Sequence, residues 1–276
     1  MSQKVMEQPD VSQKVLVHYE VEDKVAVITL DDPPANTYTH EMMLQLDAAI
    51  VRARFDTDVE VIVLTGKGEK FFSAGANINM LNEADPVWKY YFCLHANETL
   101  SRLEQTPKLT IAALNGHTVG GGMEIAMAAD LRIARKGAGK MGLPEVNLGV
   151  LPGTGGTQRL CRIVGKSHAI ELMVQGDLFD FEVAHEKLLV NQVLEADGHE
   201  DFMRQVMEYA KSFTTPGKAS MAVGHIKRSV QSGAEIAFEY GLALERELQA
   251  KLFASKDGKE GIAAYVEKRT ADFKGA

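Results

Sequence analysis

Cysteine is scarce in this chain of 276 residues, because only Cys93 and Cys161 occur and neither belongs to a CxxC or another metal-type cluster. Two isolated thiols exclude a fold built on disulfides and are typical of reduced side chains in a reducing compartment. The eight histidines include no HExxH motif. The sequence therefore gives no support for a metal site.

Long apolar runs and an excess of positive charge are missing as well. No apolar run approaches the roughly 20 residues of a membrane span, and the N-terminus shows no apolar core of a secretory signal. Lys and Arg number 30 against 38 Asp and Glu, and the net charge of −8 disfavours nucleic acid as a partner. We expect a cytoplasmic protein, or one that is mature in an organelle matrix, without membrane or nucleic-acid contacts.

Phosphate-binding motifs can be tested, and they fail. Residues 165–167 end like a P-loop, but Leu160 occupies the position of the required first glycine. Residues 153–158 begin like a dinucleotide fingerprint, but Gln158 stands where the third glycine belongs. Neither segment predicts a nucleotide site.

The patterns that are present alternate between strand and helix, which predicts an α/β fold whose helices cover a sheet. An opening hairpin is expected with its turn at 22–23, and Thr39 is the expected N-cap of the first helix. The expected strands are 16–21, 24–30, 59–66, 109–114 and 131–134, and the expected helices run from Thr39 to about Phe55, from about Pro86 to Gln105, after Gly122, and over 202–210, 236–252 and 261–270.

Three regions follow from these patterns. Residues 1–14 form an N-terminal extension, residues 15–200 form the α/β core with the site, and residues 201–276 form a helical C-terminal region. No linker rich in Gly, Ser or Pro separates the last two, so we expect the helices to pack on the core, on a partner subunit, or on both.

Two glycine-rich turns, at 71–78 and 115–124, each follow an expected buried strand. Small residues let backbone approach a ligand closely, and the first N–H groups of the helix after Gly122 lack partners within that helix. One such N–H from each turn can bind an oxygen that becomes negative during a reaction. Taken alone, each glycine cluster is more often a tight turn.

Two glutamates stand alone in apolar stretches. Glu124 begins a helix rich in Ala and Met, and Glu145 follows Gly-Leu-Pro before another long apolar segment. Burial and mutual repulsion raise the pKa of at least one member of such a pair, which allows one to act as base and one as acid near neutrality. The alternative is an ordinary helix charge and an ordinary loop charge.

Together these segments resemble the crotonase (enoyl-CoA hydratase/isomerase) superfamily, over about residues 15–274. The matching segments are SAGANI at 73–78, NGHTVGGGME at 115–124, LPE at 143–145, LPGTGGTQRL at 151–160 and EGIAAYVEKR at 260–269. The resemblance implies a spiral of ββα repeats and a C-terminal helical trimerisation region, in a homotrimer or a hexamer made of two trimers.

The resemblance also implies the chemistry. Glu124 and Glu145 match the acid/base pair that adds water across the C2=C3 bond of a 2-enoyl-CoA, while the N–H groups of Ala76 and Gly121 form the oxyanion hole. No cofactor is expected, since coenzyme A is part of the substrate. Gly153 matches a group that positions the water, and the expected contacts to coenzyme A are Ala35, Ala74, Asn77, Ile78, Tyr265 and Lys268.

Other functions remain open at this stage. Members of the superfamily that keep the oxyanion hole also isomerise enoyl-CoA thioesters or hydrate cyclic dienoyl-CoA, and some members bind RNA. The presence of both glutamates favours hydration, and the net charge of −8 disfavours RNA. Asn77 stands where an Asp is common, and the connection between the two acids, at 135–140, is one residue longer than usual.

Overall fold

The computed structural model describes residues 14–276, so the predicted extension at 1–14 lies almost wholly outside the described part. The first structured element is the predicted hairpin, β1 (Val17–Glu22) and β2 (Val25–Leu30), paired antiparallel. The predicted turn at 22–23 is wrong by one residue. Asp23 and Lys24 form it with φ of 46° and 68°, because a two-residue hairpin turn matching the strand twist needs positive φ at both positions.

A six-stranded sheet forms the main layer, in the order β1-β2-β3-β5-β7-β10, and all its pairs after the hairpin are parallel. Successive residues of β3 point to opposite faces, and both faces are covered. Ile62 and Leu64 join one core cluster while Val61 and Val63 join another. The further strands are β3 (Val61–Gly66), β5 (Leu109–Leu114), β7 (Leu131–Arg135) and β10 (Gln192–Leu194).

A second sheet of short strands has the order β4-β6-β8-β9, and its strand β4 contacts β3 and β5 of the first sheet. Each strand of the main sheet from β3 to β7 is followed by a short strand of this second sheet and then by a helix. The predicted spiral of ββα units is therefore confirmed. The short strands are β4 (Phe71–Ser73), β6 (His117–Val119), β8 (Lys140–Gly142) and β9 (Phe179–Asp180).

N-cap side chains mark the start of the two long helices of the core. Thr39 accepts a hydrogen bond from the Met42 amide at the start of α1, as predicted, and Asp85 does the same for the amides of Val87 and Trp88 in α3. The core helices are α1 (His40–Phe55), α2 (Ile78–Glu83), α3 (Pro86–Gln105), α4 (Gly121–Met127), the 3₁₀ helix η1 (Pro144–Leu148), α5 (Gly156–Val164), α6 (Lys166–Gln175) and α7 (Phe181–Glu186).

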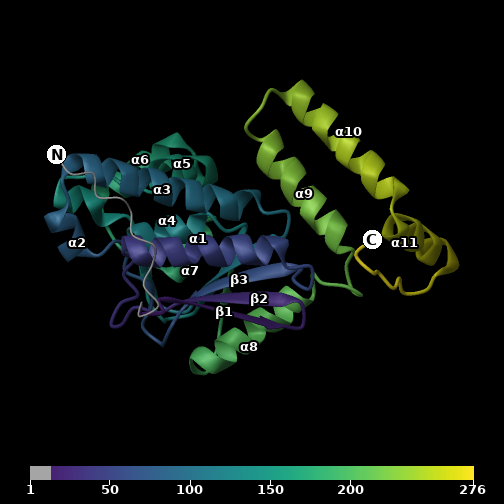
Figure 1. Cartoon of the computed structure of the whole chain (residues 1–276), viewed down its shortest axis with the longest axis horizontal. Coiled ribbons are helices and arrows are strands. Elements are labelled where there is room, and N and C mark those ends of the chain that lie inside the picture. Colours follow the sequence, from purple (N-terminus) through teal and green to yellow (C-terminus); the bar gives the residue numbers. More distant parts are fainter. Residues whose placement is uncertain (1–13) are drawn as a thin grey trace, which may run out of the picture.

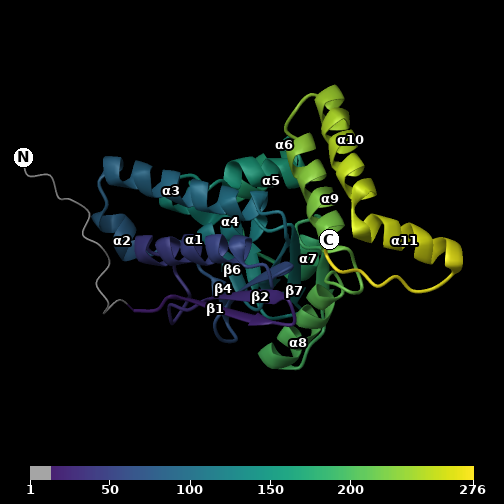
Figure 2. The ribbon, with the colours of Figure 1, turned by 45° about the vertical axis from the view of Figure 1, so that its right-hand side comes forward.

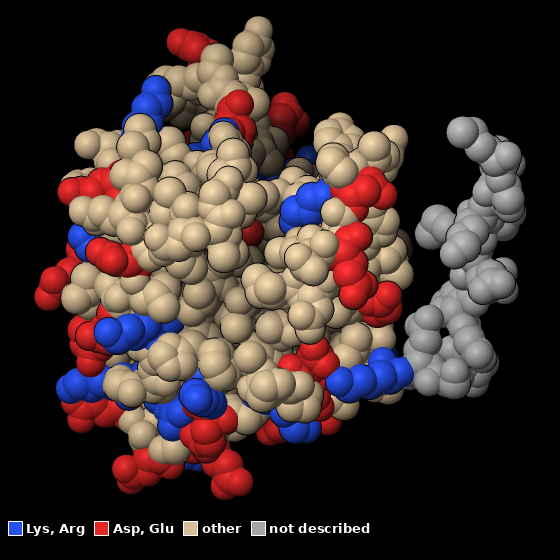
Figure 3. All heavy atoms as spheres, turned by 90° about the vertical axis from the view of Figure 1, so that its left-hand side faces the viewer, with Lys and Arg blue, Asp and Glu red and all other residues tan. Residues whose placement is uncertain are grey.

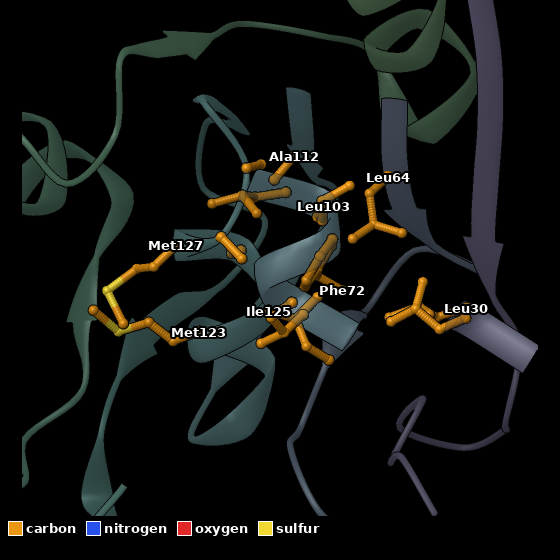
Figure 4. Packing of buried hydrophobic residues seen from close by; sticks show 14 of the residues in the cluster. Leu30, Leu64, Phe72, Leu103, Ala112, Met123, Ile125 and Met127 are labelled. Carbon is orange, nitrogen blue, oxygen red and sulfur yellow. The ribbon is translucent and has the colours of Figure 1, made fainter. Parts of the chain in front are cut away.

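Helix α4 lies inside the core, and all seven of its residues are buried. Figure 4 shows Ile125 of this helix near Phe72, with Leu30 and Leu64 on one side and Met123 and Met127 on the other, and all six belong to one buried cluster. A helix that is apolar on every side is stable only when it is buried on every side. The acidic residue in its first turn, Glu124, is buried together with the rest of the helix.

The C-terminal helices divide into two groups. Helix α8 (Gly198–Lys211) covers the main sheet with Phe202, Val206 and Ala210, so the predicted division at residue 200 falls inside a helix that packs on the core. Helices α9 (Ser220–Gly233), α10 (Phe238–Ala254) and α11 (Lys256–Glu267) follow, and Figures 1 and 2 show α10 and α11 projecting away from the sheets.

Helix α11 differs from its prediction at 261–270. It begins five residues earlier, because the Ser255 hydroxyl accepts a hydrogen bond from the Gly258 amide as its N-cap. It ends at Glu267, where Lys268 turns into the left-handed region with φ of 55°. None of the helices between residues 14 and 276 has the length and apolarity that a membrane crossing requires.

Candidate active site

A cavity of about 430 Å³ opens where α2, the start of α3, α4, η1 and the loop before α5 meet. Figure 3 shows this end of the molecule, whose middle is hollowed and nearly free of charged side chains, while charged groups gather at its margins. Of the residues predicted from the sequence, the cavity is lined by Ala74, Ala76, Ile78, Gly121, Glu124, Glu145 and Gly153. Ala74 and Gly153, which are 79 positions apart in sequence, thus line one site.

Glu124 reaches this cavity from the first turn of α4 and is 2% exposed. Its Oε1 accepts two hydrogen bonds of 2.7 Å, from the amides of Thr154 and Gly156 at the start of α5. Burial raises the pKa of Glu124, while these two amides and the charge of Arg159 oppose that rise. The carboxylate therefore sits where a helix N-terminus favours negative charge.

Glu145 reaches the same cavity from η1 and is half-buried. Its Oε2 is buried and has no hydrogen-bond partner in residues 14–276. Burial, and to a lesser degree the negative charge of Glu124, raise the pKa of Glu145 to about 7, with Lys89 acting weakly in the other direction. A buried carboxyl oxygen without a partner is uncommon and is ready to bind a ligand or a water molecule.

The two glycine-rich turns meet beside these carboxyls. Gly75 has φ of 87°, and a Cβ there would lie 2.8 Å from the amide nitrogen of Gly121. Tyr38 pairs with this turn as a parallel bridge: its N–H donates to the carbonyl of Gly75 and its carbonyl accepts from the amide of Asn77. The N–H of Ala76, between these two, points to the other side of the bridge. Within residues 14–276 the N–H groups of Ala76 and Gly121 have no hydrogen-bond acceptor.

Glycine is required at these turns for space as well as for conformation. A Cβ on Gly121 would lie 2.3 Å from the Tyr38 hydroxyl, and one on Gly120 would lie 3.0 Å from Oε1 of Glu145. One on Gly156 would lie 2.9 Å from Oε1 of Glu124. Three glycines thus leave room for the two carboxyls and the phenol.

Sequence reasoning missed Tyr38, Thr154 and Gly156. Tyr38 is buried and lines the cavity, with its hydroxyl 2.9 Å from Oγ1 of Thr154. Burial, and then the charge of Glu124, raise the pKa of Tyr38, so its hydroxyl keeps its proton. The glycine-rich pattern of 153–158 was the signal that could have indicated Thr154 and Gly156, because such a segment exposes backbone amides to an anion. The anion is the Glu124 carboxylate of the same chain and not a phosphate.

The predicted contacts to coenzyme A are dispersed. Ala74 and Ile78 line the cavity, while Ala35 lies beside it and accepts a hydrogen bond from the Ala74 amide. The Asn77 side chain is the N-cap of α2 and accepts from the Met80 amide. Tyr265 and Lys268 belong to α11 and its end, far from α2 in Figures 1 and 2, so one chain does not bring them to the cavity.

Known proteins resemble this chain along nearly its whole length. The family model for enoyl-CoA hydratase/isomerase matches residues 20–276. The chain belongs to the enoyl-CoA hydratase/isomerase family. Among its relatives, the short-chain-enoyl-CoA hydratase of Clostridium acetobutylicum is 37% identical over 251 residues, which cover 91% of this chain and 94% of that protein. The 2,3-dehydroadipyl-CoA hydratase of Escherichia coli is 36% identical, over 92% of this chain and 96% of that protein.

Solved structures of the family extend the likeness to the fold. An enoyl-CoA hydratase from Geobacillus kaustophilus superposes with a TM-score of 0.91 at 43% identity, over 96% of this chain and 98% of that one. A Bacillus anthracis enoyl-CoA hydratase gives 0.88 at 30% identity, over 95% and 100% of the two chains. The family membership and the α/β spiral predicted from the sequence are both confirmed.

Proposed function

We propose that this protein hydrates the C2=C3 double bond of a 2-enoyl-CoA thioester to give a 3-hydroxyacyl-CoA. The observation that carries the proposal is the meeting, in one cavity, of two carboxyls with different surroundings and two N–H groups without acceptors. The hydratase names of relatives that align along nearly their whole length support the same activity.

The thioester oxygen binds between the amides of Ala76 and Gly121. As water adds at C3, charge moves onto this oxygen and the thioester becomes enolate-like. Preorganised N–H groups stabilise that charge more than they stabilise the neutral carbonyl, and removal of one such donor typically costs roughly 10²- to 10³-fold in rate. The close approach of Gly75 to Gly121 is what places the two donors side by side.

The glutamates divide the proton transfers. Glu124, whose charge is favoured by two amides and Arg159, removes a proton from the water as its oxygen attacks C3. Glu145, whose pKa of about 7 leaves it substantially protonated at neutral pH, donates a proton to C2. The pair then returns to its starting state when the proton on Glu124 passes to Glu145, and the net reaction adds one water molecule.

Gly153, which lines the cavity, helps to place the water. Ala74 and Ile78, which also line the cavity, contact coenzyme A together with Ala35 and Asn77. Tyr265 and Lys268 join them from another subunit of a homotrimer or of a hexamer built from two trimers. The exposed apolar side chains of the projecting helices support self-association: Phe238, Tyr240, Phe253, Tyr265 and Val266 are 65% to 87% exposed. A cytoplasmic location completes the proposal, supported by two free thiols.

The test is a panel of enoyl-CoA thioesters, from crotonyl-CoA to longer and branched chains, followed by loss of absorbance of the conjugated thioester and by product mass. Hydration adds the mass of one water, whereas isomerisation leaves the mass unchanged. Turnover of none of these thioesters by the wild-type protein would refute the proposal. A product of unchanged mass would assign the cavity to isomerisation instead. The molar mass of the assembly by light scattering tests the trimer and the hexamer.

A further inference from the structure

The loop that holds Glu124 is itself held from outside the cavity. Thr154 donates its N–H to Oε1 of Glu124 on the inner side, and its carbonyl accepts a hydrogen bond of 3.0 Å from Nη1 of Arg159 on the outer side. Gly155, between the two bound amides, has φ of 103° and leaves space for the guanidinium, since a Cβ there would meet Nη1 of Arg159.

Arg159 is in turn fixed by Glu104, near the end of α3. Its Nε and Nη2 donate to the two carboxylate oxygens of Glu104 at 2.8 Å and 2.7 Å, which is the two-point geometry that orients a guanidinium most strictly. Both side chains are largely buried, at 11% and 24% exposure. A continuous series of hydrogen bonds therefore runs from α3 through Arg159 and Thr154 to the Glu124 carboxylate.

The same guanidinium affects the charge of Glu124. Burial raises the pKa of Glu124, and Arg159 is among the groups that lower it again. An arginine in this place has two effects on the proposed base: it fixes the loop whose amides orient the carboxylate, and it favours the ionised form that accepts a proton.

The chain contains a matched pair for comparison. Arg162, one helical turn further along α5, makes the same two-point pair with Glu235, at 2.6 Å and 3.1 Å. This pair is about half exposed on both sides, and its remaining bonds go to Gln158 of its own helix and not to the 153–156 loop. The Arg162–Glu235 pair therefore has the same two-point geometry as Arg159–Glu104 but does not hold the loop that binds Glu124.

We propose that Arg159, held by Glu104, is the positioning residue that fixes the 153–156 loop and thereby sets the geometry of the Glu124 carboxylate. Neither side chain lines the cavity, and the guanidinium holds the loop through the Thr154 carbonyl. This inference rests on the proposed role of Glu124 as base.

The experiment compares Arg159→Met with Arg162→Met by steady-state kinetics on crotonyl-CoA over a range of pH. Arg159→Met is expected to lower kcat roughly 10-fold or more, because small displacements of a catalytic group are costly, and to leave KM within about twofold. The acidic limb of the kcat/KM profile, which requires ionised Glu124, is expected to move to higher pH. Arg162→Met is expected to keep kcat and the acidic limb of the wild type.

Two further variants separate the effect of the hydrogen-bond geometry of Arg159 from the effect of its charge. Arg159→Lys keeps the positive charge but loses the forked donors, so we expect the acidic limb to stay near its wild-type position while kcat remains low. Glu104→Gln is expected to lower kcat in the same direction as Arg159→Met, and the double variant to be no worse than Arg159→Met alone, since both act through one contact.

The outcomes are distinct. Equal kcat and equal pH profiles for Arg159→Met and Arg162→Met, with Glu124→Gln nearly inactive, would overturn the positioning role and leave the proposed function intact. Near-normal turnover by Glu124→Gln would overturn both. A loss of kcat in Arg159→Met that follows only a loss of folded protein, measured by circular dichroism at the assay temperature, would also overturn the positioning role.

Discussion

Glu124 and Glu145 face the same cavity, but they reach it from different kinds of structure. Glu124 lies on a buried helix, and two backbone amides hold its carboxylate. Glu145 lies on a 3₁₀ helix whose later residues are exposed, and within the described residues its buried Oε2 has no partner. Burial is the largest cause of the raised pKa of both carboxyls, and the two amides that bind Glu124 oppose that rise on one side of the cavity only.

The largest effects are expected when the carboxyl of Glu124 or of Glu145 is replaced by an amide. We expect Glu124→Gln and Glu145→Gln each to lower kcat by roughly 10²-fold or more, the scale of a positioned acid or base. Glu98→Gln, an exposed glutamate on α3, is the matched control and is expected to retain wild-type kcat. Rates are measured on crotonyl-CoA; near-normal turnover in both site variants would show that neither carboxyl takes part.

The pH dependence tests the difference in charge directly. Glu145 must be protonated to act as the acid, so kcat/KM is expected to fall above its pKa of about 7, by about 10-fold for each further pH unit. Glu145→Gln is expected to lose this alkaline limb, because its residual activity no longer depends on that proton. A wild-type profile that stays flat from pH 7 to 9 would contradict the assignment of Glu145 as acid.

Stability is expected to respond to the same carboxyl. A raised pKa means that folded Glu145 keeps its proton at a pH where the unfolded chain has lost it, so the free energy of unfolding falls as pH rises from 4.5 to about 7. At pH 8, Glu145→Gln is expected to raise that free energy by about 1 to 2 kcal/mol, an effect reduced by solvent screening of a half-buried group. At pH 4.5 the gain is expected to vanish.

Urea unfolding of wild type and variant at pH 8 and pH 4.5 measures this gain, with Glu98→Gln as the control for the loss of one negative charge. Equal free energies of unfolding for Glu145→Gln and wild type at pH 8 would mean that folding does not raise the pKa of Glu145. The difference between the two glutamates would then be supported by kinetics alone.

How far the sequence predicts this site depends on the range of the interactions. Glu124 and Glu145 were found because a lone acid in an apolar stretch is a local signal, and Thr39 because an N-cap is local as well. The amides of Thr154 and Gly156 were not found as partners of Glu124, since that pairing joins positions 30 and 32 residues apart through the packing of α4 on α5. The start of α11 was misplaced because apolar spacing outweighed the Ser255 cap.

The smallest expected effect concerns the Tyr38 hydroxyl, which is linked by hydrogen bonds to Glu124 through Thr154. Tyr38→Phe keeps the ring but removes the 2.9 Å bond to Thr154, whose amide holds Glu124. Loss of about 1 kcal/mol from one hydrogen bond corresponds to about fivefold in kcat. Because no hydrogen bond joins Glu145 to Thr154 or to the Tyr38 hydroxyl within residues 14–276, the alkaline limb of the pH profile is expected to stay in place while the acidic limb moves. Tyr19→Phe, which removes a 3.3 Å bond to Asp56 away from the cavity, is the control and is expected to change neither limb. A shift of the alkaline limb in Tyr38→Phe would show that the two carboxyls are not held independently.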